Sequence, residues 1–347
     1  MQLRRLLAVC LALFATDAAR GQSFAPLTYE ARRAVSAVTL DGNLDEPAWA
    51  AADQIDKFSL YQQGSPPAQP VVARVLWDDD YVYAGFELSD ADLWGIAGHD
   101  AYLWEGDVAE LFFQPTPGVG PYYELEVSPN ADVLDLHWLE RLTDFEGAKA
   151  YESQLEAVVQ ARGTVASAAP TDPLHDDLDQ GWTLELRVPR ASLAPFAAGD
   201  TWGFLASAAD YPRPPGASTL QFTSLLPAPY GFHTYERWER LAFVEEPLTP
   251  GDADRNGRVD LADFGTLKAH FGQPGTLIEG EFTRDRQIDL ADFGVLKANF
   301  GRRGATAPEP SGLALAVAGL AAVGVGATWR SGACRGRSIS FDVEVLP

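Results

Sequence analysis

Residues 28–244 alternate short apolar runs with turn-forming residues, and this alternation constrains the fold more than any other feature of the chain. The stretch "VVARVLWDDDYVYAGFEL" (71–88) reads as two strands joined at the acidic turn Asp78-Asp79-Asp80, with successive side chains on opposite faces. Similar runs follow at short intervals in "DVAELFFQP", "YYELEVSPN", "DVLDLHW" and "WTLELRVP". Many short strands separated by Gly, Pro and Asn turns indicate a mainly β fold, an antiparallel β-sandwich of jelly-roll-like class.

The 347-residue chain is strongly acidic and nearly free of cysteine. Its net charge of −23 argues against nucleic-acid binding, which needs clustered Lys and Arg to neutralise phosphates, and it suits cation binding. The two cysteines, Cys10 and Cys334, lie in terminal segments, so we expect no disulfide framework. The length and the 46 % of apolar residues predict one large packed domain with appendages.

Both ends of the chain have the composition of targeting segments. Residues 1–21 carry two arginines before an apolar run and small residues, which predicts a secretory signal peptide. Residues 311–329 are uncharged and long enough for a transmembrane helix, and the basic tail at 330–347 favours a cytoplasmic end.

With Pro308-Glu309-Pro310 in the linker 302–310, the C-terminal helix and tail resemble a PEP-CTERM sorting signal. This resemblance implies export across the inner membrane, recognition by an exosortase, and delivery through a transient anchor to the cell surface, outer envelope or extracellular matrix. The tail "SISFDVEVLP" runs past the usual end of such signals, and a plain single-pass anchor is the alternative.

A duplicated segment follows the linker 245–250. Residues 251–272 and 280–301 are identical at 13 of 22 aligned positions. Twelve-residue calcium loops take side-chain oxygens at positions 1, 3, 5, 9 and 12, a carbonyl at position 7 and a glycine at position 6. The first copy supplies all of these, with Gly257 at position 6 and as ligands Asp252, Asp254, Asn256, Arg258 (by its carbonyl), Asp260 and Asp263.

The second copy keeps only part of this set. Its acidic ligands would be Glu281, Asp285, Asp289 and Asp292, with Thr283 at position 3. Arg286 takes the place of the glycine, so it must adopt a left-handed conformation at some cost or reshape the loop. We therefore expect a calcium (Ca²⁺) site in the first loop and a weaker one in the second, with a loop held only by its helix as the alternative.

Each loop is followed by "LADFG-x-LKA-x-FG", whose apolar residues recur at helical spacing. On these residues, 251–301 resembles a dockerin, a small α-helical module that binds calcium through two loops and docks onto cohesin domains. Leu261-Ala262 and Leu290-Ala291 occupy the positions that carry partner recognition in that family. The resemblance implies a possible cohesin-like partner, and a calcium-stabilised spacer is the alternative.

Aromatic and acidic residues of 28–244 form the candidate binding site. The order and spacing of "LDGNLDEPAW", "WEGDVAELFF", "YYELEVSPNADVLD" and "FHTYERWERLAF" resemble the family 9 carbohydrate-binding modules, which are β-sandwiches that hold sugars between aromatic rings and contain structural calcium. The resemblance implies Trp104 as one wall of a sugar slot, Glu110 as a hydroxyl acceptor, Glu124 as a second polar contact, and Tyr235, Trp238 or Phe232 as the second wall.

These features predict an exported, non-catalytic protein that binds a polysaccharide or oligosaccharide. One alternative is a glycoside hydrolase or an accessory subunit of polysaccharide degradation, with Glu110 paired to Glu124 or Glu126. A second is a haem-binding electron-transfer domain of the same sandwich fold. Its axial ligands would have to come from the five histidines, none of which lies in a recognisable motif: His99, His137, His175, His233 and His270.

Overall fold

The structure is a computed structural model that describes residues 25–61, 64–167, 172–211, 221–225, 231–245 and 249–303. The chain divides into a compact unit of residues 1–305 and a second unit of residues 306–347. The predicted signal peptide, the Pro308-Glu309-Pro310 motif, the helix at 311–329 and the tail at 330–347 lie outside the described residues. No helix in the described part of the chain combines the length and apolarity that a membrane span requires.

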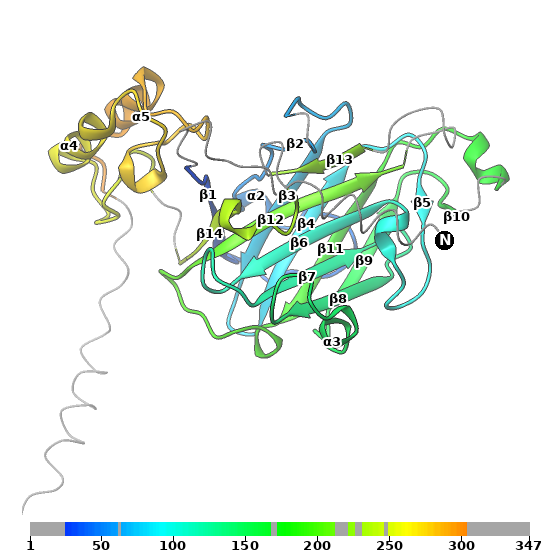
Figure 1. Ribbon diagram of the computed structural model, residues 1–347. Helices are drawn as coiled ribbons and strands as arrows, with labels where there is room; N and C mark the ends of the chain where they lie inside the picture. Colours follow the sequence, from blue (N-terminus) through cyan, green and yellow to red (C-terminus); the bar gives the residue numbers. More distant parts are fainter. Residues whose placement is uncertain are drawn as a thin grey trace, which may run out of the picture. The chain divides into compact units, whose positions relative to one another are not determined.

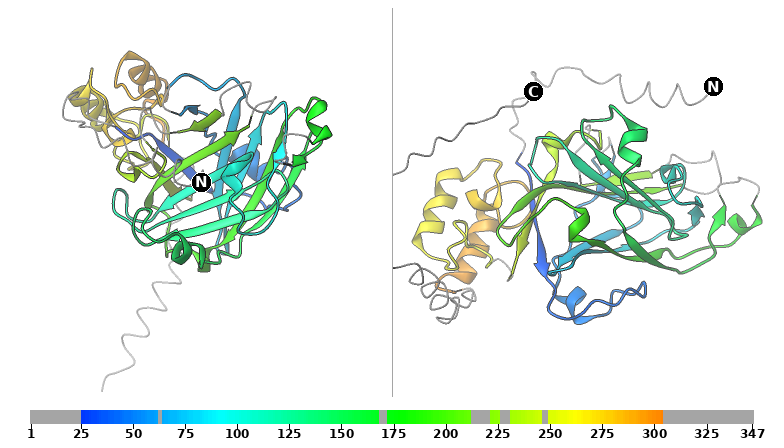
Figure 2. Two further views of the ribbon diagram at one scale, coloured as in Figure 1. Left: turned by 45° about the vertical axis from the view of Figure 1, so that its right-hand side comes forward. Right: turned by 90° about the horizontal axis from the view of Figure 1, so that it is seen from below.

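One large β-sheet that folds over into two layers dominates the regular structure of residues 28–244 (Figure 1, Figure 2). Its strands run in the order β8 (Val133–Trp138), β7 (Tyr122–Val127), β6 (Val108–Gln114), β12 (Thr201–Asp210), β14 (Glu239–Val244), β1 (Thr28–Arg33), β3 (Val71–Trp77), β4 (Tyr81–Leu88), β11 (Trp182–Pro189) and β9 (Glu156–Ala161). Off this path, β13 (Gln221–Ser224) pairs with β12 and with β2 (Ser59–Leu60), and β5 (Trp94–Gly95) pairs with β10 (Ala166–Ser167).

The predicted mainly β sandwich is confirmed, but one strand departs from the antiparallel rule. β1 runs parallel to β14, with Thr28 opposite Arg240, and parallel to β3, with Arg32 opposite Leu76. The other pairs of the long sheet path are antiparallel. A strand close to the start of the domain therefore joins the two halves of the sheet, which an alternation pattern alone does not reveal.

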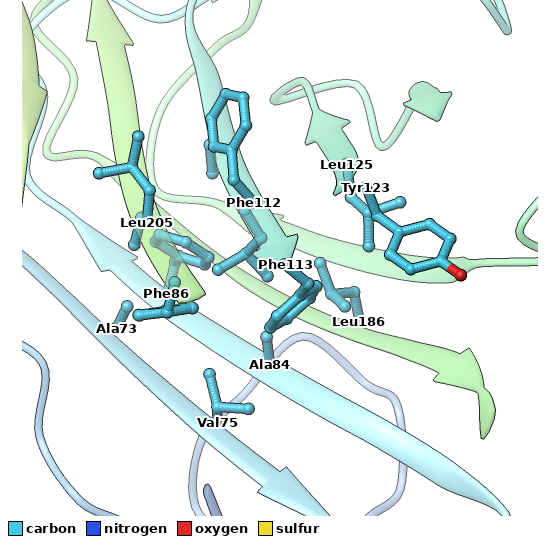
Figure 3. Packing of buried hydrophobic residues seen from close by; sticks show 14 of the residues in the cluster. Ala73, Val75, Ala84, Phe86, Phe112, Phe113, Tyr123, Leu125, Leu186 and Leu205 are labelled. Atoms are coloured by element: carbon cyan, nitrogen blue, oxygen red, sulfur yellow. The ribbon is translucent and has the colours of Figure 1, made fainter. Parts of the chain in front are cut away.

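The space between the layers is filled by alternate side chains of both halves. Val75, Ala84 and Phe86 of one layer and Phe113 of the other belong to one buried cluster (Figure 3). Figure 3 also shows that Phe112 points away from Phe113, to the opposite face of β6. Four tryptophans of the sandwich belong to the buried core: Trp49, Trp77, Trp182 and Trp202.

Few helices accompany the sheet. The sandwich carries α2 (Pro47–Ala51), α3 (Phe145–Lys149) and the 3-10 turns η2 (Leu103–Glu105), η3 (Pro173–Asp176), η4 (Arg190–Ser192) and η5 (Tyr235–Arg237). In the duplicated segment lie α4 (Leu261–His270), η6 (Leu277–Glu279) and α5 (Leu290–Asn299).

The two helices of the duplicated segment, called the helical pair below, have a small core of their own. Val259, Leu267, Ile288 and Leu296 are buried together, two from each copy. Each helix begins at a capping box. The side chain of the N-cap residue, Asp260 or Asp289, accepts a backbone amide of the first turn, and the carboxylate three residues later accepts the amide of the N-cap residue. The repeated sequence thus forms two equivalent loop–helix units that share one core.

Candidate functional site

The outer face of β6, β7 and β12 collects acidic residues in one place. Glu110 on β6 lies opposite Glu126 on β7 and opposite Ser207 on β12, and Phe112 lies opposite Glu124. Residues opposite each other on neighbouring strands present their side chains to the same face. Strand pairing therefore brings three glutamates from two neighbouring strands together on one face of the sheet. We call Glu110, Glu124 and Glu126 the acid cluster.

Loops and rings cover the acid cluster, so its carboxylates are nearly buried. Ser207 donates its hydroxyl to Glu110, and the Trp138 indole Nε1 donates to Glu124 over 2.6 Å. Glu110 and Glu124 are 4 % and 5 % exposed, and Glu126 is fully buried. Only the edges of Glu110 and Glu124 can meet a ligand, because most of each carboxylate faces protein.

Burial shifts the acid cluster toward its neutral form. Desolvation raises the pKa of Glu110 to about 7, and desolvation with the nearby Glu110 charge raises the pKa of Glu124 to about 8. The pKa of Glu126 rises well above its usual value, because of burial first and then the Glu110 and Glu124 charges. At neutral pH the three groups therefore share protons.

The acid cluster should make folding stability fall as pH rises. The pKa of a glutamate in the unfolded chain is about 4.3, whereas these groups titrate higher when folded, so the native state binds more protons between about pH 4.5 and pH 8. We expect the free energy of unfolding, measured with urea, to drop by several kcal/mol across this window, because each pKa unit corresponds to about 1.4 kcal/mol. In Glu126→Gln the slope should flatten, and an unchanged slope would contradict the assignment.

Trp104 belongs to a layer of rings beside the acid cluster. We call this layer, which includes Tyr102, Trp104, Phe145, Trp138 and Tyr235, the ring layer. Its ring lies 5.0 Å from that of Tyr102 and 5.9 Å from that of Phe145, and Phe145 lies 6.1 Å from Trp138, the donor to Glu124. Trp104 is half-buried, and Tyr102 is 41 % exposed. The backbone carbonyl of Trp104 accepts a 2.8 Å hydrogen bond from the Tyr211 hydroxyl, which fixes the turn that carries the ring. The structure thus places Trp104 at the surface and links it by rings to the acid cluster.

The segment 232–238 forms the other end of the ring layer. Tyr235 is half-buried, and the Arg141 guanidinium lies 3.9 Å from the centre of its ring. Trp238 packs against Tyr122 and Phe112 and is fully buried. Its indole N–H donates to the Phe232 carbonyl over 2.6 Å.

These positions separate the candidates for the second wall. Trp238 is enclosed on all sides and cannot present a ring to a ligand in this arrangement, so it supports the layer from below. Phe232 is half-buried but stacks on Tyr61, with ring centres 4.6 Å apart. Tyr235 has one face of its ring covered by Arg141 but is only half-buried, so it remains the candidate for the second wall.

Three histidines of the sandwich are engaged in packing and hydrogen bonds. His233 Nδ1 lies 2.7 Å from the Tyr122 hydroxyl, and burial lowers the pKa of His233 to about 4, so the ring is neutral at pH 7. His137 stacks on Tyr123 at 4.5 Å, and His175 contacts Asp92 at 3.0 Å. None of these rings is placed as an open haem ligand in the described part of the chain.

Sequence reasoning missed several members of the site. Tyr102, Phe145, Trp138 and Arg141 complete the ring layer, and Ser207 completes the acid cluster. Tyr102 could have been found, because it lies two residues from Trp104 in the same loop. The others come from separate segments, and only strand register and loop packing bring them together.

Two clusters in the sandwich have the donors that a divalent cation prefers. Ligand atoms of Asp90, Asp107 and Asp210 lie within 4.8 Å of one another, as do those of His99, Asp135 and Glu152. Asp107 already accepts hydrogen bonds from the Trp94 and Tyr211 amides.

The first loop of the helical pair brings three acidic side chains together. Oxygens of Asp252, Asp254 and Asp263 lie within 4.8 Å of one another. Gly257 has φ 79°, so the left-handed turn that the calcium-loop pattern requires at position 6 is present. With Asn256, Asp260 and the Arg258 carbonyl, which the sequence pattern adds, the donor types are those that Ca²⁺ prefers.

The second loop has the same backbone but a weaker donor set. Arg286 takes the left-handed conformation with φ 70°. Asp292 accepts from the Phe282 and Thr283 amides, and Glu281 accepts from the Asp285 amide over 2.9 Å. Among the residues that the structure describes, three groups of acidic or histidine ligands converge within 4.8 Å, and the second loop forms none of them.

An open groove of about 570 Å³ lies away from the ring layer. It is lined by residues 38–40 and by residues of β9 and β11, including Glu156 and Arg187. Arg187 pairs with Glu156 at 2.8 Å, so the charged groups of the groove satisfy each other. The groove has no aromatic lining and is the weaker candidate for a saccharide site.

Comparison with known proteins finds one matching family model. Residues 40–211 match the model of the family described as carbohydrate family 9 binding domain-like. The chain therefore contains a domain like the family 9 carbohydrate-binding modules. No curated protein matches the chain.

Three solved structures are similar to 63 % of this chain. A candidate carbohydrate-binding protein from Bacteroides uniformis is 14 % identical over 100 % of its own length, with a TM-score of 0.46. A family 9 module from Caldicellulosiruptor kristjanssonii, in complex with cellotriose, is 11 % identical over 95 % of its length, with a TM-score of 0.42. A module of the same description from that organism, in complex with glucose, is 11 % identical over 97 % of its length, with a TM-score of 0.42.

Proposed function

We propose that the protein is an exported, non-catalytic carbohydrate-binding protein that holds a polysaccharide or its chain end on the ring layer. The observation that carries this proposal is the half-buried Trp104, linked ring to ring with the exposed Tyr102 and, through Phe145, with Trp138 above Glu124. Flat rings suit the C–H faces of sugars, and polar groups beside them suit the hydroxyls.

Each side chain of the site has a distinct part in this proposal. Trp104 is one wall, and Tyr235, backed by Trp238 at 6.1 Å, is the other. The edges of Glu110 and Glu124 accept sugar hydroxyls while the same carboxylates hold Ser207 and Trp138 in place. Binding rather than turnover is favoured because a glycosidase needs two carboxyls free to act as acid and base, whereas Glu126 is fully buried and Glu110 and Glu124 are nearly buried and hydrogen-bonded to Ser207 and Trp138.

The helical pair is proposed to be a calcium-stabilised docking or spacing module. Its two copies expose the same apolar residues to similar extents: Leu261 at 73 % and Leu290 at 74 %. Phe271 and Phe300 are also exposed in both copies. Two equivalent apolar helix surfaces suit a cohesin-like partner that can dock in either of two orientations, whereas a spacer would not need them.

Export completes the proposal. The signal at 1–21 sends the protein across the inner membrane, and an exosortase acts on the sorting signal at 308–329 to release it to the cell surface, outer envelope or matrix. The acidic net charge is compatible with an exported, calcium-binding protein.

A glycan array tests the proposal on the purified protein. We expect binding to a subset of plant or algal polysaccharides and no release of reducing sugar from any of them. Turnover that is abolished by Glu110→Gln would establish the glycosidase alternative instead. A Soret band in the expressed protein, with no glycan bound, would favour the haem alternative.

A further inference from the structure

The second repeat carries two arginines in left-handed backbone positions. Arg284 has φ 59° and Arg286 has φ 70°. At the position that corresponds to Arg286, the first repeat has Gly257, for which this conformation is free of strain. An L-residue in this region costs about 1–2 kcal/mol, so a strained arginine that replaces a glycine needs a compensating contact.

Arg286 makes that contact with the sandwich. Its guanidinium pairs with the carboxylate of Glu239, the first residue of β14, and donates to the Ala25 carbonyl over 3.1 Å. Glu239 is fully buried and also accepts the Leu27 amide. Because a buried carboxylate that loses its partner costs about 3–5 kcal/mol, this pair outweighs the strain at Arg286.

Arg284 makes a second contact of the same kind. Its guanidinium pairs with Asp53, which is 8 % exposed, and donates to the Gln54 carbonyl over 3.2 Å. It also lies 4.8 Å from the centre of the Tyr29 ring on β1. A guanidinium that meets a carboxylate and an aromatic face together is held by charge and by cation–π attraction.

We propose that the second loop is a docking element that fastens the helical pair to the sandwich at Glu239 and Asp53. In this proposal the arginine at position 6 of the second loop serves the contact with Glu239 and has no part in binding calcium. The two copies differ at position 6, since Gly257 turns the first loop beside its acidic ligands whereas Arg286 of the second loop pairs with a buried acid of the sandwich.

Hydrogen exchange on the full chain tests the docking. We expect Arg286→Gly to speed exchange of the amides at 25–31 at least tenfold, because Leu27 donates to the released Glu239. The amides of α5 should keep their protection, since glycine accepts φ 70° without strain. Lys268→Ala, which removes an exposed positive charge from α4, is the matched control and should change neither region.

A second variant separates docking from a purely local role of Arg286. In Glu239→Gln the buried partner is neutral but still accepts the Leu27 amide, so adding Arg286→Gly should speed exchange at 25–31 less than it does in the wild type. Equal effects in both backgrounds would overturn the proposal. Unchanged exchange at 25–31 in Arg286→Gly would also overturn it, as would an equal loss of protection in α5.

Discussion

Asp263→Ala is expected to destabilise the helical pair strongly and to abolish its stabilisation by calcium. Asp263 is fully buried and accepts the amides of Ala253 and Asp260 at 2.8 Å each, and that of Asp254 at 3.3 Å. Hydrogen bonds to charged groups contribute about 1.5–3 kcal/mol each, so the loss is on the order of 4 kcal/mol before the metal is considered. A two-helix module has little stability to spare, and metal binding supplies part of it.

Asp292→Ala is the matched control, because Asp292 has the same role in the second loop. It accepts the amides of Phe282, Thr283 and Asp289 at 2.6, 3.0 and 2.9 Å. Both variants should unfold more easily in a chelator, followed by circular dichroism on heating. Added calcium should raise the melting temperature of the wild type and of Asp292→Ala, but not that of Asp263→Ala. A calcium response that survives in Asp263→Ala would refute the assignment of the site.

Trp104→Ala is expected to weaken saccharide binding about thirtyfold or more while the fold persists. A tryptophan at the centre of a binding surface typically contributes about 2 kcal/mol or more. The domain should stay folded, because Trp104 is half-buried and the Tyr211 hydroxyl bonds to its backbone, which the variant keeps. Calorimetric titration with the best glycan of the array gives the affinity, and near-UV circular dichroism reports the fold.

Tyr81→Ala is the control for this variant, since Tyr81 is a half-buried ring that packs on Tyr83 outside the ring layer. Its affinity should equal that of the wild type. Equal affinities of Trp104→Ala and Tyr81→Ala would remove Trp104 from the site.

The strands were predictable because their signals are local. The run 71–88 forms β3 and β4 around the turn at Asp78–Asp80, as its alternation indicates. The parallel course of β1 was not predictable, because Thr28 pairs with Arg240 from the far end of the domain. Alternation identifies a strand but carries no information about a partner so distant in sequence.

The candidate site was predictable in its residue types but not in their exposure. Glu110 and Glu124 each alternate with apolar residues along their own strands, a pattern that predicts an outward polar face. In the structure, rings from other segments cover both side chains. Trp238 lies in the same aromatic segment as Tyr235, and only the packing of Phe112 and Tyr122 encloses it. Burial of this kind is decided by tertiary contacts, which sequence spacing does not encode.

The second loop of the helical pair shows the same limit of sequence-based prediction for a single side chain. The pattern of positions 1 to 12 left two possibilities at Arg286, a left-handed backbone or a reshaped loop, and the structure has the left-handed backbone. The pattern could not predict the buried partner of that side chain, Glu239, which lies 47 residues away in the sandwich.

The most direct test of saccharide binding at the ring layer is a crystal structure of the protein with the strongest oligosaccharide of the array. We predict a sugar ring stacked on the Trp104 indole, with hydroxyls within hydrogen-bond distance of Glu110 or Glu124. Density for the sugar in the groove beside Glu156 and Arg187, with Trp104 free, would contradict the account.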